Sequence, residues 1–103
     1  MRRVVRSRTY VAQLKELLDQ GIERFGIAVV EQKLALIDRT LEIFLAQHPK
    51  AKPPHPTLGL RVYPISGTPF LVLYDFTETD LRTHFIFHKN ASLEDLDPGS
   101  AEW

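Results

Sequence analysis

Hydrophobic positions in the first half of the chain recur at steps of three and four, the spacing of one face of an α-helix. One such stripe runs over residues 10–25 and a second over residues 29–45. Gly26 lies between them, where a helix is expected to end or bend, and Ser7 or Thr9 can cap the first helix. The pattern predicts two amphipathic helices joined as an antiparallel hairpin. The stripe residues expected in the core are Leu14, Leu17, Leu34, Ile37 and Leu41.

The second half of the chain carries shorter segments rich in β-branched and aromatic residues, separated by turns. We expect strands over residues 58–65, 70–76 and 81–88, and a further short strand over residues 3–7. Residues 70–76 are apolar on both faces, as in a central strand covered by helices on one side. Residues 48–56 include four prolines and predict an extended, exposed connection.

The order of these elements predicts an α+β fold with the topology β-α-α-β-β-β. The helical hairpin should pack on one face of a small, mostly antiparallel sheet. The N-terminal strand should join that sheet through the long connection formed by both helices. We expect residues 1–103 to form one domain, in which residues 89–103 are an acidic C-terminal tail.

The composition narrows the class of protein. The 103 residues include no cysteine, which excludes a disulfide framework, a thiolate nucleophile and a cysteine-built metal site, and fits a reducing compartment. No apolar run approaches the roughly 20 residues that span a bilayer. The basic start is followed by charged residues where a signal peptide would be apolar. We therefore expect a soluble cytoplasmic protein that does not associate with a membrane.

Charge is distributed unevenly between the two halves of the chain. Residues 1–61 hold eleven Lys or Arg and six Asp or Glu, whereas residues 62–103 hold two and seven. The basic half suits an acidic protein partner or a phosphate backbone, and an ordinary solvated surface accounts for it equally well. Because the aromatic residues on the predicted helices belong to the core stripes, no stacking platform for bases is evident. Direct, sequence-specific binding of nucleic acid is therefore not expected.

Few residues are candidates for a catalytic, metal-binding or partner-binding role. Arg61 lies in an otherwise apolar run, so it must be paired or exposed on a working surface. His84 and His88 are four apart, which on one face of a strand separates them by about 13 Å, too far to share a metal ion. His88 is either a hydrogen-bonded residue at a strand end or a residue with a direct role in function. Trp103 either folds back on the domain or meets a partner. We expect no metal and no cofactor, because the sequence lacks a metal motif, a nucleophilic triad and a phosphate-cradling glycine loop.

Several short motifs occur in a distinctive order between residues 3 and 90. They are Arg8-Thr9-Tyr10, Leu14-Lys15-Glu16-Leu17, Phe25-Gly26, Leu45 followed by His48-Pro49, Gly59-Leu60-Arg61, Tyr74 and Phe87-His88. Together they resemble the RelE/ParE family of toxins from bacterial type II toxin–antitoxin modules. The fold that this resemblance implies, a helical hairpin against a small antiparallel sheet, is the one that the periodicity predicts.

The resemblance implies one of two activities. RelE-like members are ribosome-dependent endoribonucleases that cut mRNA, and ParE-like members inhibit DNA gyrase by binding. RNA cleavage without a metal needs a base, a cation and an acid around one phosphate, which here would involve Arg61 and His88. After Lys89, however, there is no Lys, Arg or Tyr. The tail instead carries four carboxylates, which would repel RNA and favour the ParE-like branch; they are Glu94, Asp95, Asp97 and Glu102.

The ParE-like branch implies a toxin, typical of plasmid stabilization systems, that binds DNA gyrase and is neutralised by a cognate antitoxin protein in a heteromeric complex. The residues expected to bind the target are Arg61, His88, Lys89 and Trp103. Those expected to bind the antitoxin are Leu18, Ile22, Arg39 and Tyr74. The alternatives are a RelE-like ribonuclease and a protein that keeps the fold and its binding surfaces without toxicity.

Overall fold

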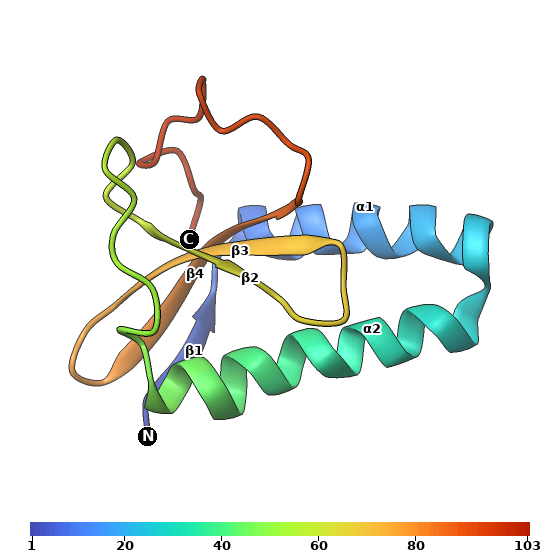
Figure 1. Ribbon diagram of the computed structural model, residues 1–103, viewed down its shortest axis with the longest axis horizontal. Helices are drawn as coiled ribbons and strands as arrows, with labels where there is room; N and C mark the ends of the chain where they lie inside the picture. Colours follow the sequence, from blue (N-terminus) through green and yellow to red (C-terminus); the bar gives the residue numbers. More distant parts are fainter.

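The computed structural model describes residues 1–103, and its elements follow the predicted order (Figure 1). The strands are β1 (Arg3–Arg6), β2 (Arg61–Pro64), β3 (Phe70–Phe76) and β4 (Asp80–His88). The helices are α1 (Arg8–Phe25) and α2 (Ile27–Arg39), and α2 continues into a π-helical segment, η1 (Thr40–Leu45). The predicted α+β fold and its β-α-α-β-β-β topology are confirmed. No helix is both long enough and apolar enough to span a membrane.

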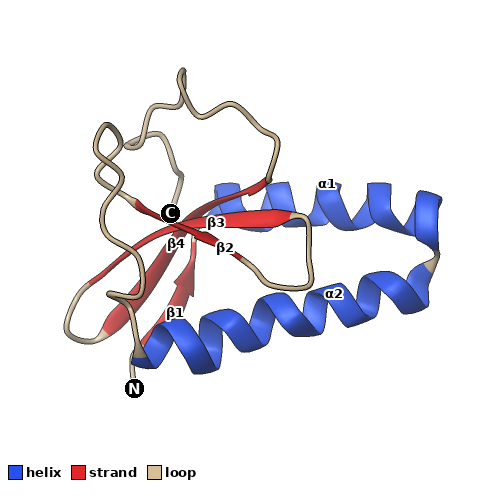
Figure 2. Ribbon diagram, in the orientation of Figure 1, coloured by secondary structure: helices blue, strands red, loops and turns tan.

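The four strands form one mixed sheet in the order β1-β4-β3-β2 (Figure 2). The β2–β3 and β3–β4 pairs are antiparallel, as a meander requires. The β1–β4 pair is parallel, and the long connection between these two strands contains the helical hairpin, β2 and β3. This connection agrees with the prediction.

Two small residues determine where the helices begin and end. The Ser7 hydroxyl accepts a hydrogen bond of 2.8 Å from the backbone N–H of Tyr10, which caps α1, and donates one of 2.7 Å to the carbonyl of His84 in β4. Gly26 ends α1 and begins α2 with a φ of 85°, a left-handed value that favours glycine. Ser7 thus ties the hairpin to the sheet, and Gly26 reverses the chain.

The sheet is covered on both faces. On one face the helices pack against β3 and β4 in a core that includes Tyr10, Ile37, Leu41, Val72, Tyr74 and Leu81. On the other face a smaller cluster forms around Leu58, Leu60, Leu73 and Phe85, and Leu93, Leu96 and Ala101 pack against it. These last three come from residues 89–103, which we call the C-terminal strap. The strap has no helix or strand and lies across the sheet face opposite the hairpin.

Two expectations about the strands need correction. Strand β2 begins at Arg61, three residues later than predicted, because residues 56–58 form a turn and Gly59, which follows it, has a φ of 75°. In β4 the register shifts so that Thr83 pairs with Tyr74 and Phe85 with Leu73, which leaves His84 as an extra, bulged residue. The bulge reverses the alternation of side chains, so His84 and His88 lie on opposite faces and not on one.

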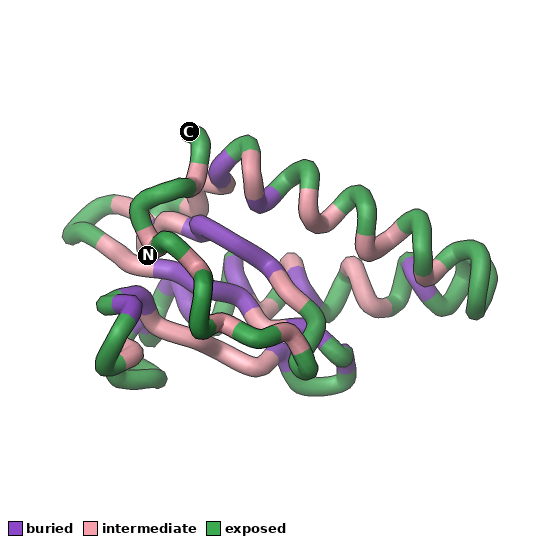
Figure 3. The backbone as a smooth tube through the Cα atoms, turned by 90° about the horizontal axis from the view of Figure 1, so that it is seen from above, coloured by how far each residue is buried: buried purple, intermediate pink, exposed green.

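The hairpin extends beyond the sheet. Figure 3 shows the end of the hairpin near Gly26 as exposed, and every residue from Ile22 to Val29 is in the exposed class. Leu14 and Leu17 pack against the core as expected, whereas Leu34 is only partly buried and belongs to neither core cluster. The apolar stripes therefore continue past the sheet that covers them, and their outer parts have no partner within this chain.

Candidate partner-binding site

The outer part of the hairpin forms two apolar grooves. The first, of about 400 Å³, lies between the helices and the start of β3; its apolar lining includes Leu18, Phe25, Val29 and Phe70. The second groove, also about 400 Å³, is lined by residues of the two helices alone, and its apolar lining includes Val11, Ile22, Ile27 and Leu34. Of these side chains, Phe25 is 64% exposed and Ile27 is 62% exposed. Exposed apolar surface of this kind is typical of a site for a protein partner.

Three of the four residues expected at the antitoxin interface are accessible. Leu18 lines both grooves, and Ile22 lines the second and is 41% exposed. Arg39 is exposed at the end of α2, and no carboxylate lies within ion-pair distance of it. The apolar pair and the free guanidinium lie on the same hairpin, where one long partner segment can reach all three.

Tyr74, the fourth residue, is inaccessible to a partner, and the prediction that it binds the antitoxin is therefore wrong. It has no exposed surface, because β3 is the central strand between β4 and β2 and this residue points into the helix-side core. Its hydroxyl donates a hydrogen bond of 2.7 Å to the carbonyl of Pro49. Tyr74 therefore holds the proline-rich connection in place and offers no surface to a partner.

Arg61 belongs to a basic corner at the beginning of β2. Its guanidinium donates a hydrogen bond of 2.5 Å to the carbonyl of Lys52 and lies 5.1 Å from the ring centroid of Phe76. The guanidinium of Arg2 lies 4.9 Å from the same centroid, so the ring interacts with two cations. Neither arginine is within ion-pair distance of a carboxylate. Sequence reasoning could not place Arg2 beside Phe76, because the two residues are distant in the chain.

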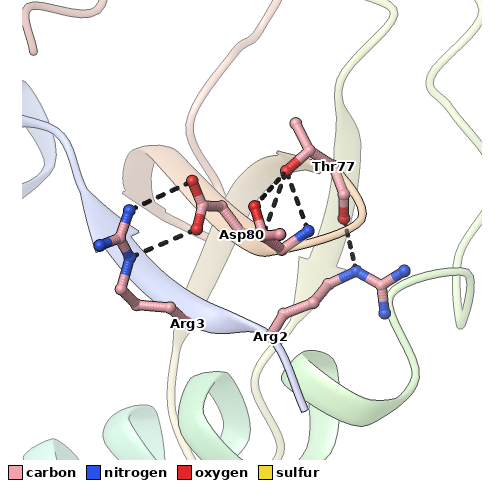
Figure 4. A network of polar contacts seen from close by, with 5 residues as sticks. Arg2, Arg3, Thr77 and Asp80 are labelled. Carbon is pink, nitrogen blue, oxygen red and sulfur yellow. Dashed lines mark hydrogen bonds and ion pairs between the residues drawn. The ribbon is translucent and has the colours of Figure 1, made fainter.

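Strand β1 is fastened to the same corner. Figure 4 shows Arg2 and Arg3 reaching from the start of β1 toward the turn between β3 and β4. Arg2 donates a hydrogen bond of 2.6 Å to the carbonyl of Thr77, and Arg3 forms an ion pair of 3.3 Å with Asp80. The basic corner is thus held by backbone acceptors and by one exposed ion pair, and it keeps a net positive charge.

His88 and Lys89 lie at the other end of the sheet. His88 is the exposed last residue of β4, and its ring meets Phe70 edge to face at 6.5 Å. The backbone N–H of Lys89 donates a hydrogen bond of 2.7 Å to the carbonyl of Pro69, and its side chain is exposed. The position of His88 at a strand end agrees with the sequence interpretation.

The structure does not bring Arg61 and His88 together. Arg61 pairs with Tyr74 of β3, and His88 pairs with Phe70 of the same strand, on its other side. Four residues along a strand span about 13 Å, and two strand spacings add about 10 Å across the sheet, so their backbones are about 16 Å apart. The guanidinium of Arg61 is held against Lys52 and Phe76, and the ring of His88 lies against Phe70, so the two groups do not converge on one phosphodiester.

Trp103 lies on the strap side of the sheet, beside a polar cluster. The ring of Trp103 meets that of His84 edge to face at 4.8 Å, and the guanidinium of Arg82 lies 5.4 Å from its centroid. Asp75 accepts two hydrogen bonds from Arg82, of 2.8 and 2.7 Å, and its carboxylate lies 3.2 Å from Nε2 of His84. Trp103 therefore folds back on the domain, which is one of the two possibilities that the sequence left open, and 48% of the residue is still exposed.

Electrostatics in this cluster favour an ionised carboxylate. Burial alone would raise the pKa of Asp75, but the two hydrogen bonds from Arg82 and the neighbouring His84 ring hold it below its usual value. The hydrogen bonds to Asp75 raise the pKa of Arg82. No set of three His, Asp or Glu side chains is arranged to hold a metal ion.

No family model and no curated protein sequence matches this chain. Its fold matches a chain of the solved structure described as the chromosomal ParDE TA system from P. aeruginosa, with a TM-score of 0.69. The two chains are 16% identical, and the match covers 85% of this chain and 96% of the other. At this level of identity the likeness shows that the two chains share a fold.

Proposed function

We propose that this protein is the toxin of a type II toxin–antitoxin pair, that it belongs to the ParE-like branch, and that it binds DNA gyrase and stalls its DNA-cleaved state. The observation that carries the proposal is the likeness of fold to a chain of a ParDE system, over nearly the whole length of that chain. The setting would be the bacterial cytoplasm, and the biological role would be that of a plasmid stabilization module.

The exposed hairpin supports neutralisation by an antitoxin. A partner helix lying in an apolar groove buries anchors spaced three and four residues apart, and the grooves beside Leu18 and Ile22 offer apolar surface for such anchors. The net charge of residues 1–61 is +5, so an acidic partner would be attracted to this half of the chain. Arg39 would pair with one of the partner's carboxylates at the end of α2.

The residues proposed to bind the target occupy separate parts of the surface. His88 and Lys89 lie at one end of the sheet, Arg61 lies at the basic corner, and Trp103 lies on the strap side. Such separation suits contact with a large macromolecule, which can touch several patches at once. It does not suit chemistry at one bond, which needs its groups within hydrogen-bond distance of the reacting atoms.

The ribonuclease alternative has two observations against it. The cation and the imidazole that it would use belong to Arg61 and His88, whose backbones are about 16 Å apart by strand geometry. The carboxylates of the strap, Glu94, Asp95, Asp97 and Glu102, are all exposed and form no ion pair within the chain. Their charge would repel an RNA backbone that approached from that side.

Expression of the protein in bacterial cells without an antitoxin tests this proposal. We expect growth arrest with filamentation and induction of a DNA-damage reporter, and no new 5′ ends in primer extension on translated messages. Arg61→Ala serves as the comparison variant, because a ribonuclease that depends on Arg61 would lose its cleavage products.

The other outcomes are equally informative. Cuts inside translated codons that disappear in Arg61→Ala would replace this proposal with the ribonuclease. Normal growth at a confirmed expression level would indicate a binding protein without toxicity.

A further inference from the structure

The C-terminal strap is attached to the domain mainly at its two ends. At its start, Lys89 bonds to the carbonyl of Pro69. At its end, the backbone N–H of Arg8 donates a hydrogen bond of 2.6 Å to the carbonyl of Glu102, whose own N–H donates to the Thr9 hydroxyl at 2.9 Å. Figure 1 shows the strap leaving β4, arching away from the sheet and returning to it at the C-terminus.

Between these ends the strap makes no polar contact with the rest of the chain. From Ser92 to Ala101, every hydrogen bond joins two residues of the strap itself, as in the turn that Asp97 forms with Gly99 and Ser100. None of its carboxylates forms an ion pair. Only Leu93, Leu96 and Ala101 hold the middle of the strap to the sheet. A segment held in this way can open locally without unfolding the domain.

The end of the strap is held by Trp103, and the site that receives it is built by β3 and β4. The bulge at His84 turns this imidazole to the strap side of the sheet, where it meets the edge of the indole. Asp75 holds both Arg82 and His84, so the guanidinium beside the indole is fixed by two hydrogen bonds. A cation held against an aromatic ring in this way stabilises the docked position of the ring.

We propose that residues 89–103 are a conformational device: Trp103 is a latch on the Asp75–Arg82–His84 cluster, and its release lets the strap open as a unit while the hairpin and sheet stay folded. Opening uncovers the apolar surface formed by Leu73 and Phe85 of the sheet and by Leu58 and Leu60 of the loop before β2. The closed form hides this surface, and the open form presents it together with the acidic strap. The device does not depend on which target the protein binds.

Hydrogen exchange measured by mass spectrometry on the full chain tests the latch. In Trp103→Ala we expect amide exchange over residues 91–101 to accelerate by about tenfold, while exchange in β3 and α2 stays as in the wild type. Phe25→Ala removes an exposed aromatic ring from the far end of the hairpin, and it should leave exchange in the strap unchanged. An unchanged strap in Trp103→Ala, or equal acceleration in β3 and α2, would overturn the proposal.

A second measurement needs no change at the latch residue itself. Trp103 is the only tryptophan, so its fluorescence reports the latch directly. Asp75→Asn removes the charge that fixes Arg82 and His84, and we expect acrylamide to quench the tryptophan more strongly in this variant than in the wild type. The far-ultraviolet circular dichroism should be unchanged. Equal quenching in the two proteins would show that the cluster does not hold the strap.

Discussion

The Tyr74 hydroxyl joins β3 to the proline-rich connection through its bond to the Pro49 carbonyl. Burial of the phenol disfavours its ionised form and raises its pKa to about 12, although the nearby Arg61 partly offsets this effect. Burial also raises the pKa of Tyr10. A residue that the family resemblance assigns to a partner surface is here a buried structural residue.

Tyr74→Phe should destabilise the protein by about 1 to 2 kcal/mol at pH 7, because the Pro49 carbonyl loses its donor. Urea unfolding measures this change in the free energy of unfolding. A folded pKa near 12 lies above the ordinary value of 10, so Tyr74 stabilises the wild type fully below pH 10. This contribution is lost as the pH rises from about 10 to 12.

Tyr74→Phe is also the control for the loss of stability at alkaline pH, because Tyr10 and the lysines titrate in both proteins. The wild type should lose more stability than Tyr74→Phe between pH 10 and pH 12. Parallel pH profiles in the two proteins would contradict the assigned role of Tyr74.

At the scale of secondary-structure elements, much of the fold follows from periodicity. The stripes that begin at Tyr10 and Val29 predicted both helices, and the apolar, β-branched and aromatic residues of Phe70–Phe76 predicted the central strand with its bounds. The bulge at His84 could not be predicted, because it arises from the register with β3 and not from any local pattern. For the same reason the distance between Arg61 and His88 became clear only once both were paired to one strand.

Gly26 offers a test of the hairpin. Its φ of 85° is strained for any residue with a Cβ atom, although no atom lies within 4 Å of the Cβ that alanine would add. Gly26→Ala should therefore cost about 1 to 2 kcal/mol of unfolding free energy, from backbone strain alone. Gly99→Ala is the matched control, since Gly99 has no such φ and its nearest atom to an added Cβ is 3.5 Å away. If thermal melts show equal losses for the two variants, the strain argument is wrong.

The grooves of the hairpin give a prediction about the antitoxin. Ile22→Glu places a charge in the second groove and should weaken binding of the cognate antitoxin by at least about 2 kcal/mol, as measured by titration calorimetry. Because Ile22 is already partly exposed, the fold should be retained. Gln20→Glu adds the same charge on the same helix outside both apolar grooves, and it should bind the antitoxin almost as the wild type does. Equal affinity of the two variants would place the antitoxin elsewhere.

At the scale of the whole molecule, the sequence predicts the hairpin side of the sheet better than the strap side. The sequence predicts a polar, acidic tail over residues 89–103, because two leucines, Leu93 and Leu96, are too few to establish a period. Only the folded chain shows that they cover the second sheet face and that Trp103 returns to Arg82 and His84. Long-range contacts of irregular segments leave no periodic signal, so this part of the site was beyond sequence reasoning.

The positions of the charges, like those of the strap contacts, could not be predicted from the sequence. The basic and acidic halves of the sequence are recognisable by counting, but the counts do not show where the charges gather. In the folded protein Arg2 and Arg61 meet over Phe76 at one corner, and the acidic strap lies across the strap side of the sheet. A partner that approaches the basic corner and one that approaches the strap therefore meet opposite charges.

The most direct test of the proposed function uses purified protein, DNA gyrase and relaxed plasmid. We predict that the protein inhibits supercoiling and that linear plasmid accumulates when the reaction is stopped with detergent and protease, because the toxin stalls the DNA-cleaved state. In parallel, mRNA on reconstituted ribosomes should remain intact. Unimpaired supercoiling together with cleaved mRNA would contradict the account and show that the protein is a ribonuclease.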